Sequence, residues 1–120
     1  MSYRYNFYAR NGKYNNQKIV YNGITFDSQK ECRRYMELIK LEELGYIEGL
    51  ELQPKFLLQE GYRKNGKKIR AIYYIADFKY YDCEKCEIII EDVKGIKTDV
   101  YKLKKKLFEY KYKDYTIKEI

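Results

Sequence analysis

The sequence predicts a single α+β domain in which a central mixed sheet is flanked by two helices. Its 120 residues suit one hydrophobic core, and 45% of them are apolar, which excludes wholesale disorder. Two stretches have the apolar spacing of helices, and the stretches between and after them have the pattern of strands. We expect residues 1–22 to form an N-terminal arm and residues 23–120 to form the domain.

The predicted elements follow one another as helix, three antiparallel strands, helix and strand. The arm is expected to contain one short strand at residues 18–21. We expect helices over residues 28–44 and 98–112, and strands over residues 47–58, 69–81, 87–94 and 115–120.

The first helix has clear signals at both ends. Asp27 or Ser28 can cap its start, and Glu31 follows Ser28 at the spacing of a capping box. Gly45 can end it. The direction of Glu31 falls inside the apolar arc of the helix. That arc is formed by Cys32, Tyr35, Leu38 and Ile39.

Turn residues divide the strands that follow. Pro54 cannot donate to a strand ladder, so we expect a break there in the first strand. Asn65 and Gly66 are a strong hairpin signal. We place the turn of the next hairpin at Glu84 and Lys85.

The second helix begins after a loop at residues 95–97. Thr98 or Asp99 can cap it. Its expected apolar side consists of Val100, Leu103, Leu107 and Phe108.

The charge of the chain favours a polyanionic partner. The net charge is +7, which points to nucleic acid before a membrane surface, although a solvated basic exterior is the alternative. Sixteen tyrosines can stack on bases or fill half-buried sheet faces. No apolar run approaches the roughly 20 residues of a membrane span, and the start lacks the apolar core of a signal peptide. We therefore expect a cytoplasmic protein without membrane contact.

The cysteines and the absence of histidine exclude several kinds of site. Three cysteines, Cys32, Cys83 and Cys86, are a poor basis for a disulfide framework. Cys83 and Cys86 have the spacing of metal ligands, but a structural zinc site needs four ligands. We therefore favour a turn that carries two thiols. Without histidine, the usual base for serine or cysteine nucleophiles is missing.

Acidic residues come together on the hairpin between residues 69 and 95. With the turn at Glu84 and Lys85, Asp77 faces Asp92, and facing Cβ atoms lie roughly 5 Å apart. Two carboxylates that close repel each other unless a cation lies between them. Because side chains alternate along a strand, Lys94 shares the face of Asp92, whereas Glu91 points to the other side.

Such a cluster suits the hydrolysis of a phosphodiester. Asp77 and Asp92, with the carbonyl of Val93, can hold Mg²⁺ or Mn²⁺. Lys94 can act near the attacking water or the phosphate, and Glu31 is a further candidate carboxylate. The candidate contacts to the nucleic-acid backbone are Arg33, Arg34, Lys67, Lys68, Lys102, Lys105 and Lys106.

Structural roles for the same residues remain open at this point. Asp77 and Lys94 can form a salt bridge near a sheet edge while Asp92 is solvated. Glu31 can serve only in the capping box. A non-catalytic nucleic-acid-binding module would also keep the basic surface and the tyrosines.

Asp77 followed by Asp92, Val93 and Lys94 resembles the signature of the PD-(D/E)XK nucleases. The likeness is closer to phage and prophage Holliday-junction-resolvase-like endonucleases and extends over residues 13–120. Ala76 stands where the signature has proline. The resembling stretches are residues 23–28, 31–35, 50–56, 74–78, 91–95 and 98–104.

This resemblance implies a restriction-endonuclease-like αβββαβ core and a metal-dependent endodeoxyribonuclease. Asp77 and Asp92 would be metal ligands, Lys94 the catalytic lysine and Glu31 an acidic residue carried by the helix. Branched DNA would be the substrate, a homodimer the active species, and the host cytoplasm its location if a phage encodes it. An end-processing or nicking nuclease of the same fold is the alternative.

Overall fold

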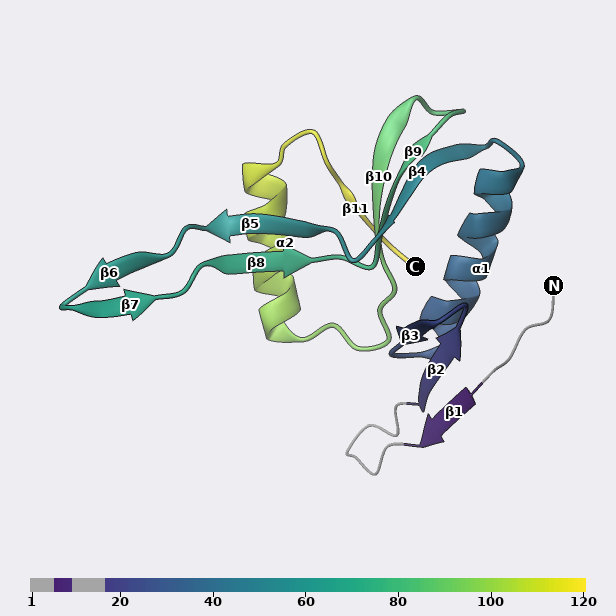
Figure 1. Cartoon of the computed structure of the whole chain (residues 1–120). Coiled ribbons are helices and arrows are strands. Elements are labelled where there is room, and N and C mark those ends of the chain that lie inside the picture. Colours follow the sequence, from purple (N-terminus) through teal and green to yellow (C-terminus); the bar gives the residue numbers. More distant parts are fainter. Residues whose placement is uncertain (1–5, 10–16) are drawn as a thin grey trace. The chain divides into compact units, whose positions relative to one another are not determined.

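The computed structural model describes residues 6–9 and 17–120 (Figure 1). The chain divides into two compact units, Met1–Leu44 and Gly45–Ile120, which we describe one at a time. This division differs from the predicted one after residue 22, because two paired strands lie on either side of that position. The elements belong to the α+β class, with one mixed sheet in the second unit, as the sequence predicts.

The first unit combines a small antiparallel sheet with one helix. Strands β1 (Asn6–Ala9), β2 (Gln17–Tyr21) and β3 (Ile24–Phe26) pair in that order. The predicted strand at 18–21 is thus confirmed and forms part of a sheet. The rest of the predicted arm, residues 1–5 and 10–16, lies outside the described residues.

Helix α1 (Gln29–Glu43) packs on β2 and β3 and starts at the predicted cap. The Ser28 hydroxyl accepts a hydrogen bond from the Glu31 N–H at 3.1 Å. The ring of Tyr35 lies 5.1 Å from that of Phe26. The buried helix residues are Glu31, Cys32, Tyr35 and Leu38, so the predicted apolar arc is confirmed except at Ile39, which is half-buried, and Glu31 lies within it.

The mixed sheet of the second unit has the order β11-β10-β9-β4. Its strands are β4 (Ile47–Leu52), β9 (Phe78–Asp82), β10 (Glu87–Asp92) and β11 (Ile117–Glu119). Strand β10 pairs antiparallel with β9 and parallel with β11, and β4 pairs antiparallel with β9. The β4–β9 pairing contains a register shift between Glu48 and Glu51.

The predicted turn at Glu84 and Lys85 gives the observed register of β9 and β10. Asp82 pairs with Glu87, and Phe78 pairs with Glu91. The carboxylate of Asp82 accepts hydrogen bonds from the N–H groups of Glu84 and Lys85, at 3.0 and 3.1 Å. The two thiols are therefore carried by a turn that a side-chain carboxylate stabilises.

The predicted long strand over residues 69–81 is wrong, because the chain changes partners twice in this stretch. It contains the end of β7 (Lys67–Ile69), then β8 (Ile72–Ile75) and most of β9. Strand β7 pairs with β6 (Tyr62–Lys64), and β8 pairs with β5 (Lys55–Gln59).

The second change of partner is marked by backbone hydrogen bonds. The N–H of Ala76 still donates to Pro54, whereas that of Asp77 donates to Glu91 of β10. The break predicted at Pro54 is confirmed, because it separates β4 from β5. The hairpin predicted at Asn65 and Gly66 is also confirmed; these residues have φ angles of 52° and 75°, as a two-residue hairpin turn requires.

Helix α2 (Asp99–Lys111) is capped by Thr98, as predicted, but of its predicted apolar side only Phe108 is buried. Val100, Leu103 and Leu107 are exposed, and the buried residues are Tyr101 and Phe108. Large aromatic rings bury more area than aliphatic side chains, and here they meet other rings. Their core partners are Phe56, Tyr74, Ala76, Ile90 and Ile117.

Candidate active site

Asp77 lies just before β9, one residue past the last pair of the β9–β10 hairpin. Its N–H donates to the Glu91 carbonyl at 3.1 Å. Its carboxylate Oδ2 accepts from the Val93 N–H at 2.7 Å. The half-buried Asp77 side chain is therefore fixed at the end of β10, where Asp92 lies.

Asp92 is buried, with 1% of its surface exposed. Its Oδ2 accepts a hydrogen bond from the Tyr74 hydroxyl. Its Oδ1 lies 3.0 Å from the Lys94 Nζ. The alternative in which Asp92 is solvated is thus wrong, and Lys94 does share the side of Asp92.

Lys94 also contacts an aromatic ring of the core. Its Nζ lies 4.3 Å from the centre of the Tyr101 ring, and its side chain is 26% exposed. A cation above a ring face is attracted by the ring's electrons. The Lys94 side chain therefore runs from the buried Asp92 carboxylate towards the surface, and the Tyr101 ring stabilises its ammonium group.

Two tyrosine hydroxyls in this region stay protonated donors. Burial, followed by the hydrogen bond to Asp92, raises the pKa of Tyr74; the charge of Asp77 acts in the same direction. Burial, followed by the hydrogen bond to Glu119, raises the pKa of Tyr101. Neither phenol can therefore act as a general base near neutral pH.

Glu119 completes the cluster from β11, where it pairs in register with Asp92. Its carboxylate accepts from the Tyr101 hydroxyl at 2.8 Å and lies 3.3 Å from the Nζ of both Lys97 and Lys105. The hydrogen bond from Tyr101, followed by those from the two lysines, lowers the pKa of Glu119 to about 2. Glu119 is therefore ionised at neutral pH.

Glu91 is fully buried, and its tyrosine partner differs from that of the adjacent Asp92. The Tyr80 hydroxyl donates to Glu91, whereas that of Tyr74 donates to Asp92. This agrees with the predicted alternation of side chains along β10.

The donor chemistry of the cluster suits a hard divalent cation. Asp77, Asp92 and the Val93 carbonyl offer oxygen atoms, the ligands that Mg²⁺ and Mn²⁺ prefer. Among the described residues, no group of three or more Asp, Glu, Cys or His side chains could hold a metal ion. A cation held by Asp77 and Asp92 would need further ligands such as water.

The remaining predicted site residues are carried by α1, β7 and α2. Glu31 belongs to the first unit and is 9% exposed. On α1, Arg33 is exposed and Arg34 pairs with Glu37 at 2.8 Å. Lys67 and Lys68 are exposed on β7, as are Lys102 and Lys106 on α2, whereas Lys105 is held by Glu119.

Three contributors to the site were not predicted from the sequence: Tyr74, Tyr101 and Glu119. Each is far from its partner along the chain: Tyr74 and Asp92 are 18 positions apart, and so are Tyr101 and Glu119. One signal was present for Glu119, because the last predicted strand alternates and places Ile117 and Glu119 on one face.

A family model described as a protein of unknown function (DUF1064) matches residues 11–120. The chain belongs to this family. The match includes Glu31 and the whole Asp77, Asp92 and Lys94 cluster, so the candidate site lies within the part that defines the family. No curated protein and no solved structure matches the chain. In the described part of the chain, no helix is long and apolar enough to cross a membrane.

Proposed function

We propose that this chain is a metal-dependent nuclease that hydrolyses phosphodiester bonds in DNA. One observation carries the proposal: the Asp77 carboxylate is bound by the N–H of Val93, the residue after Asp92, and Asp92 pairs with Lys94. Two carboxylates and an ammonium group at the end of one hairpin are what such a reaction needs. The resemblance of the sequence to PD-(D/E)XK nucleases supports the same conclusion.

Asp77 and Asp92, with the carbonyl of Val93, would hold the divalent cation. When bound, the cation lowers the pKa of a water molecule and stabilises the charge that develops on the phosphate. Lys94 neutralises the buried Asp92 and reaches the surface, where its ammonium group can bind a phosphate oxygen or the attacking water. Tyr74 is a positioning residue, since its hydroxyl fixes the orientation of the Asp92 carboxylate.

The substrate and the assembly are inferred from the charge of the chain and from the resemblance. The net charge of +7 favours a polyanion. The resolvase-like resemblance favours branched DNA cut by a homodimer, because two symmetric sites can engage two strands. Glu31 is proposed as a further acidic residue on the same resemblance.

The test is a cleavage assay on four-way junction, flap, linear duplex and single-stranded DNA, with Mg²⁺, Mn²⁺ or EDTA. We expect internal cuts that need Mg²⁺ or Mn²⁺ and are fastest on the junction. Light scattering should give the mass of a dimer. Cuts only at ends would favour the end-processing alternative. Binding without any cleavage, with either ion, would reject the nuclease and leave a binding module.

A further inference from the structure

The β6–β7 hairpin extends the β5–β8 pair away from the mixed sheet of the second unit (Figure 1). We call residues 61–70 the ribbon. Every residue of the ribbon is exposed. A segment of this kind adds little to the core, so its sequence is not explained by packing.

The ribbon is strongly and uniformly basic. No acidic residue occurs between residues 61 and 76, and the ribbon contains five of the positive charges of the chain. Among the described residues, none of these five side chains has an ion pair. They are Arg63, Lys64, Lys67, Lys68 and Arg70.

Like charges face each other across the two strands. Arg63 pairs with Lys68, and Lys64 pairs with Lys67. Facing like charges destabilise an antiparallel pair. The ribbon therefore carries two repulsive pairs that the isolated protein does not neutralise, and a bound polyanion would relieve both.

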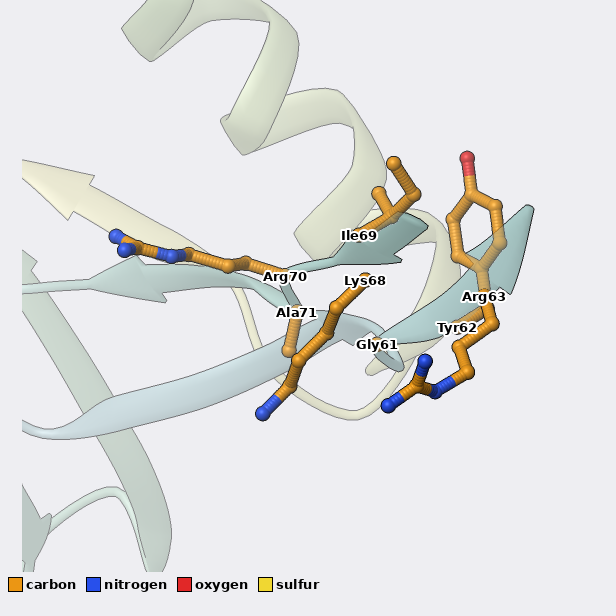
Figure 2. Close-up of a pocket in the computed structure, with 7 residues that line it drawn as sticks. All are labelled: Gly61, Tyr62, Arg63, Lys68, Ile69, Arg70 and Ala71. Atoms are coloured by element: carbon orange, nitrogen blue, oxygen red, sulfur yellow. The ribbon is translucent and has the colours of Figure 1, made fainter. Parts of the chain in front are cut away.

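The ribbon also has two different sides. Figure 2 shows Arg63 and Lys68 on one side and Tyr62 and Ile69 on the other, as the register requires. These residues, with Arg70, line a surface hollow of about 390 Å³. The backbone is tightly packed at Gly61, since a Cβ there would lie 3.0 Å from the Ile69 carbonyl oxygen.

We propose that the ribbon inserts into the major groove of duplex DNA, with Arg63, Lys68 and Arg70 against the phosphates that border it. A two-stranded ribbon fits the major groove, about 12 Å wide, but not the minor groove, about 6 Å wide. The two arms of the ribbon, residues 61–64 and 67–70, each reach about 13 Å, which is more than the groove depth of roughly 8.5 Å. The major groove of A-form RNA is too narrow for side chains to read.

This inference deepens the proposed function, since it names how the same protein holds its DNA, but it can be tested without cleavage. The measurement is fluorescence anisotropy on a linear duplex in EDTA, over a series of salt concentrations. The ribbon variant is Arg63→Ser with Lys68→Ser. The matched control is Lys85→Ser with Lys113→Ser, which removes two exposed charges elsewhere.

We expect the ribbon variant to bind on the order of tenfold more weakly, and the salt slope of log K to fall by roughly 2. The control should keep the wild-type slope. The ribbon variant should unfold at the same urea concentration as the wild type or a higher one, because one repulsive pair is gone. Equal binding by the two variants, or no binding of duplex by the wild type, would overturn the proposal.

The groove is tested with modified and competing duplexes. Glucosylated hydroxymethylcytosine fills the major groove and should weaken wild-type binding, whereas netropsin, which fills the minor groove, should not. An RNA duplex should compete poorly. Binding that is weakened by netropsin and not by glucosylation would reject insertion into the major groove. If the ribbon results hold while no cleavage is found with Mg²⁺ or Mn²⁺, the nuclease proposal fails alone; if cleavage occurs without ribbon dependence, the ribbon proposal fails alone.

Discussion

The backbone N–H of Val93 donates a hydrogen bond of 2.7 Å to the carboxylate of Asp77. This bond joins the two strands of the hairpin just past the last residue pair of their ladder. Asp77 thus has a structural role in addition to the proposed role as a metal ligand. The two roles need different substitutions to separate them.

Asp77→Asn should abolish cleavage and leave the fold intact. An amide oxygen can still accept from the Val93 N–H, but the negative charge that attracts a cation is lost. Calorimetry should show Mn²⁺ affinity at least about tenfold lower, because loss of even an outer-shell partner of a metal ligand costs about 10–100-fold. Asp114→Asn, at an exposed position, is the control. Unchanged Mn²⁺ affinity in the Asp77 variant would remove this residue from the site.

Lys94→Arg should slow cleavage without unfolding the protein. Arginine retains the positive charge next to Asp92 but is bulkier and does not give up a proton. Single-turnover cleavage should fall by about 100-fold, the lower end of what a positioned proton donor contributes. DNA affinity should change little, and Lys85→Arg should behave as the wild type. If DNA affinity falls while the rate of the cleavage step is unchanged, Lys94 only contacts the phosphate backbone of the DNA.

Glu31→Gln separates catalysis from helix capping. The Ser28 cap uses the backbone N–H of residue 31, which the substitution retains. We expect stability close to that of the wild type and a loss of cleavage. Ser28→Ala should do the reverse, lowering stability by about 1 kcal/mol through loss of the cap. Normal cleavage by Glu31→Gln would confine Glu31 to a structural role.

Tyr74→Phe should destabilise the protein by about 2 kcal/mol, because a buried carboxylate loses a hydrogen-bond donor. The phenyl ring still fills the space against Phe108, 5.2 Å away between ring centres. Urea denaturation measures the change. Tyr73→Phe is the control, since Tyr73 is 37% exposed. Equal midpoints for the two variants would show that the Tyr74 hydroxyl contributes nothing to stability.

Glu119 should make stability depend on pH in the acid range. Its pKa is lowered from 4.5 to about 2, so its contribution is complete above about pH 4.5 and is lost as the pH falls towards 2. Glu119→Gln removes that contribution at every pH. Urea midpoints of the wild type and this variant should therefore differ at pH 6 and converge near pH 2. A constant difference across this range would contradict the ion-pair assignment.

Local signals predicted the parts of the fold that depend on neighbouring residues. Ser28 caps α1, and Asn65 with Gly66 makes a hairpin, because each effect acts within a few residues. The position of one turn was enough to set the whole β9–β10 register. That register also predicted correctly that Asp92 and Lys94 share a side.

Predictions failed where tertiary contacts override local pattern. The apolar spacing of Val100, Leu103 and Leu107 predicted the buried side of α2, but the rings around Phe108 compete better for burial. In the same way, residues 69–81 have the composition of one strand, yet they pair with four different strands, β6, β5, β10 and β4. The hydrogen bond from Tyr74 to Asp92 depends on that change of partners, so sequence spacing could not reveal it.

The two outer strands of the mixed sheet bear on self-association. Strand β11 is only three residues long and carries Lys118 and Glu119, and β4 has a register shift between Glu48 and Glu51. Short, charged and bulged edges discourage another chain from adding a strand. The β10 strand that bears Asp92 is interior and has both of its edges paired. A homodimer of this protein is therefore not expected to form by strand addition at either edge of the mixed sheet, and this sheet offers little opportunity for fibril growth.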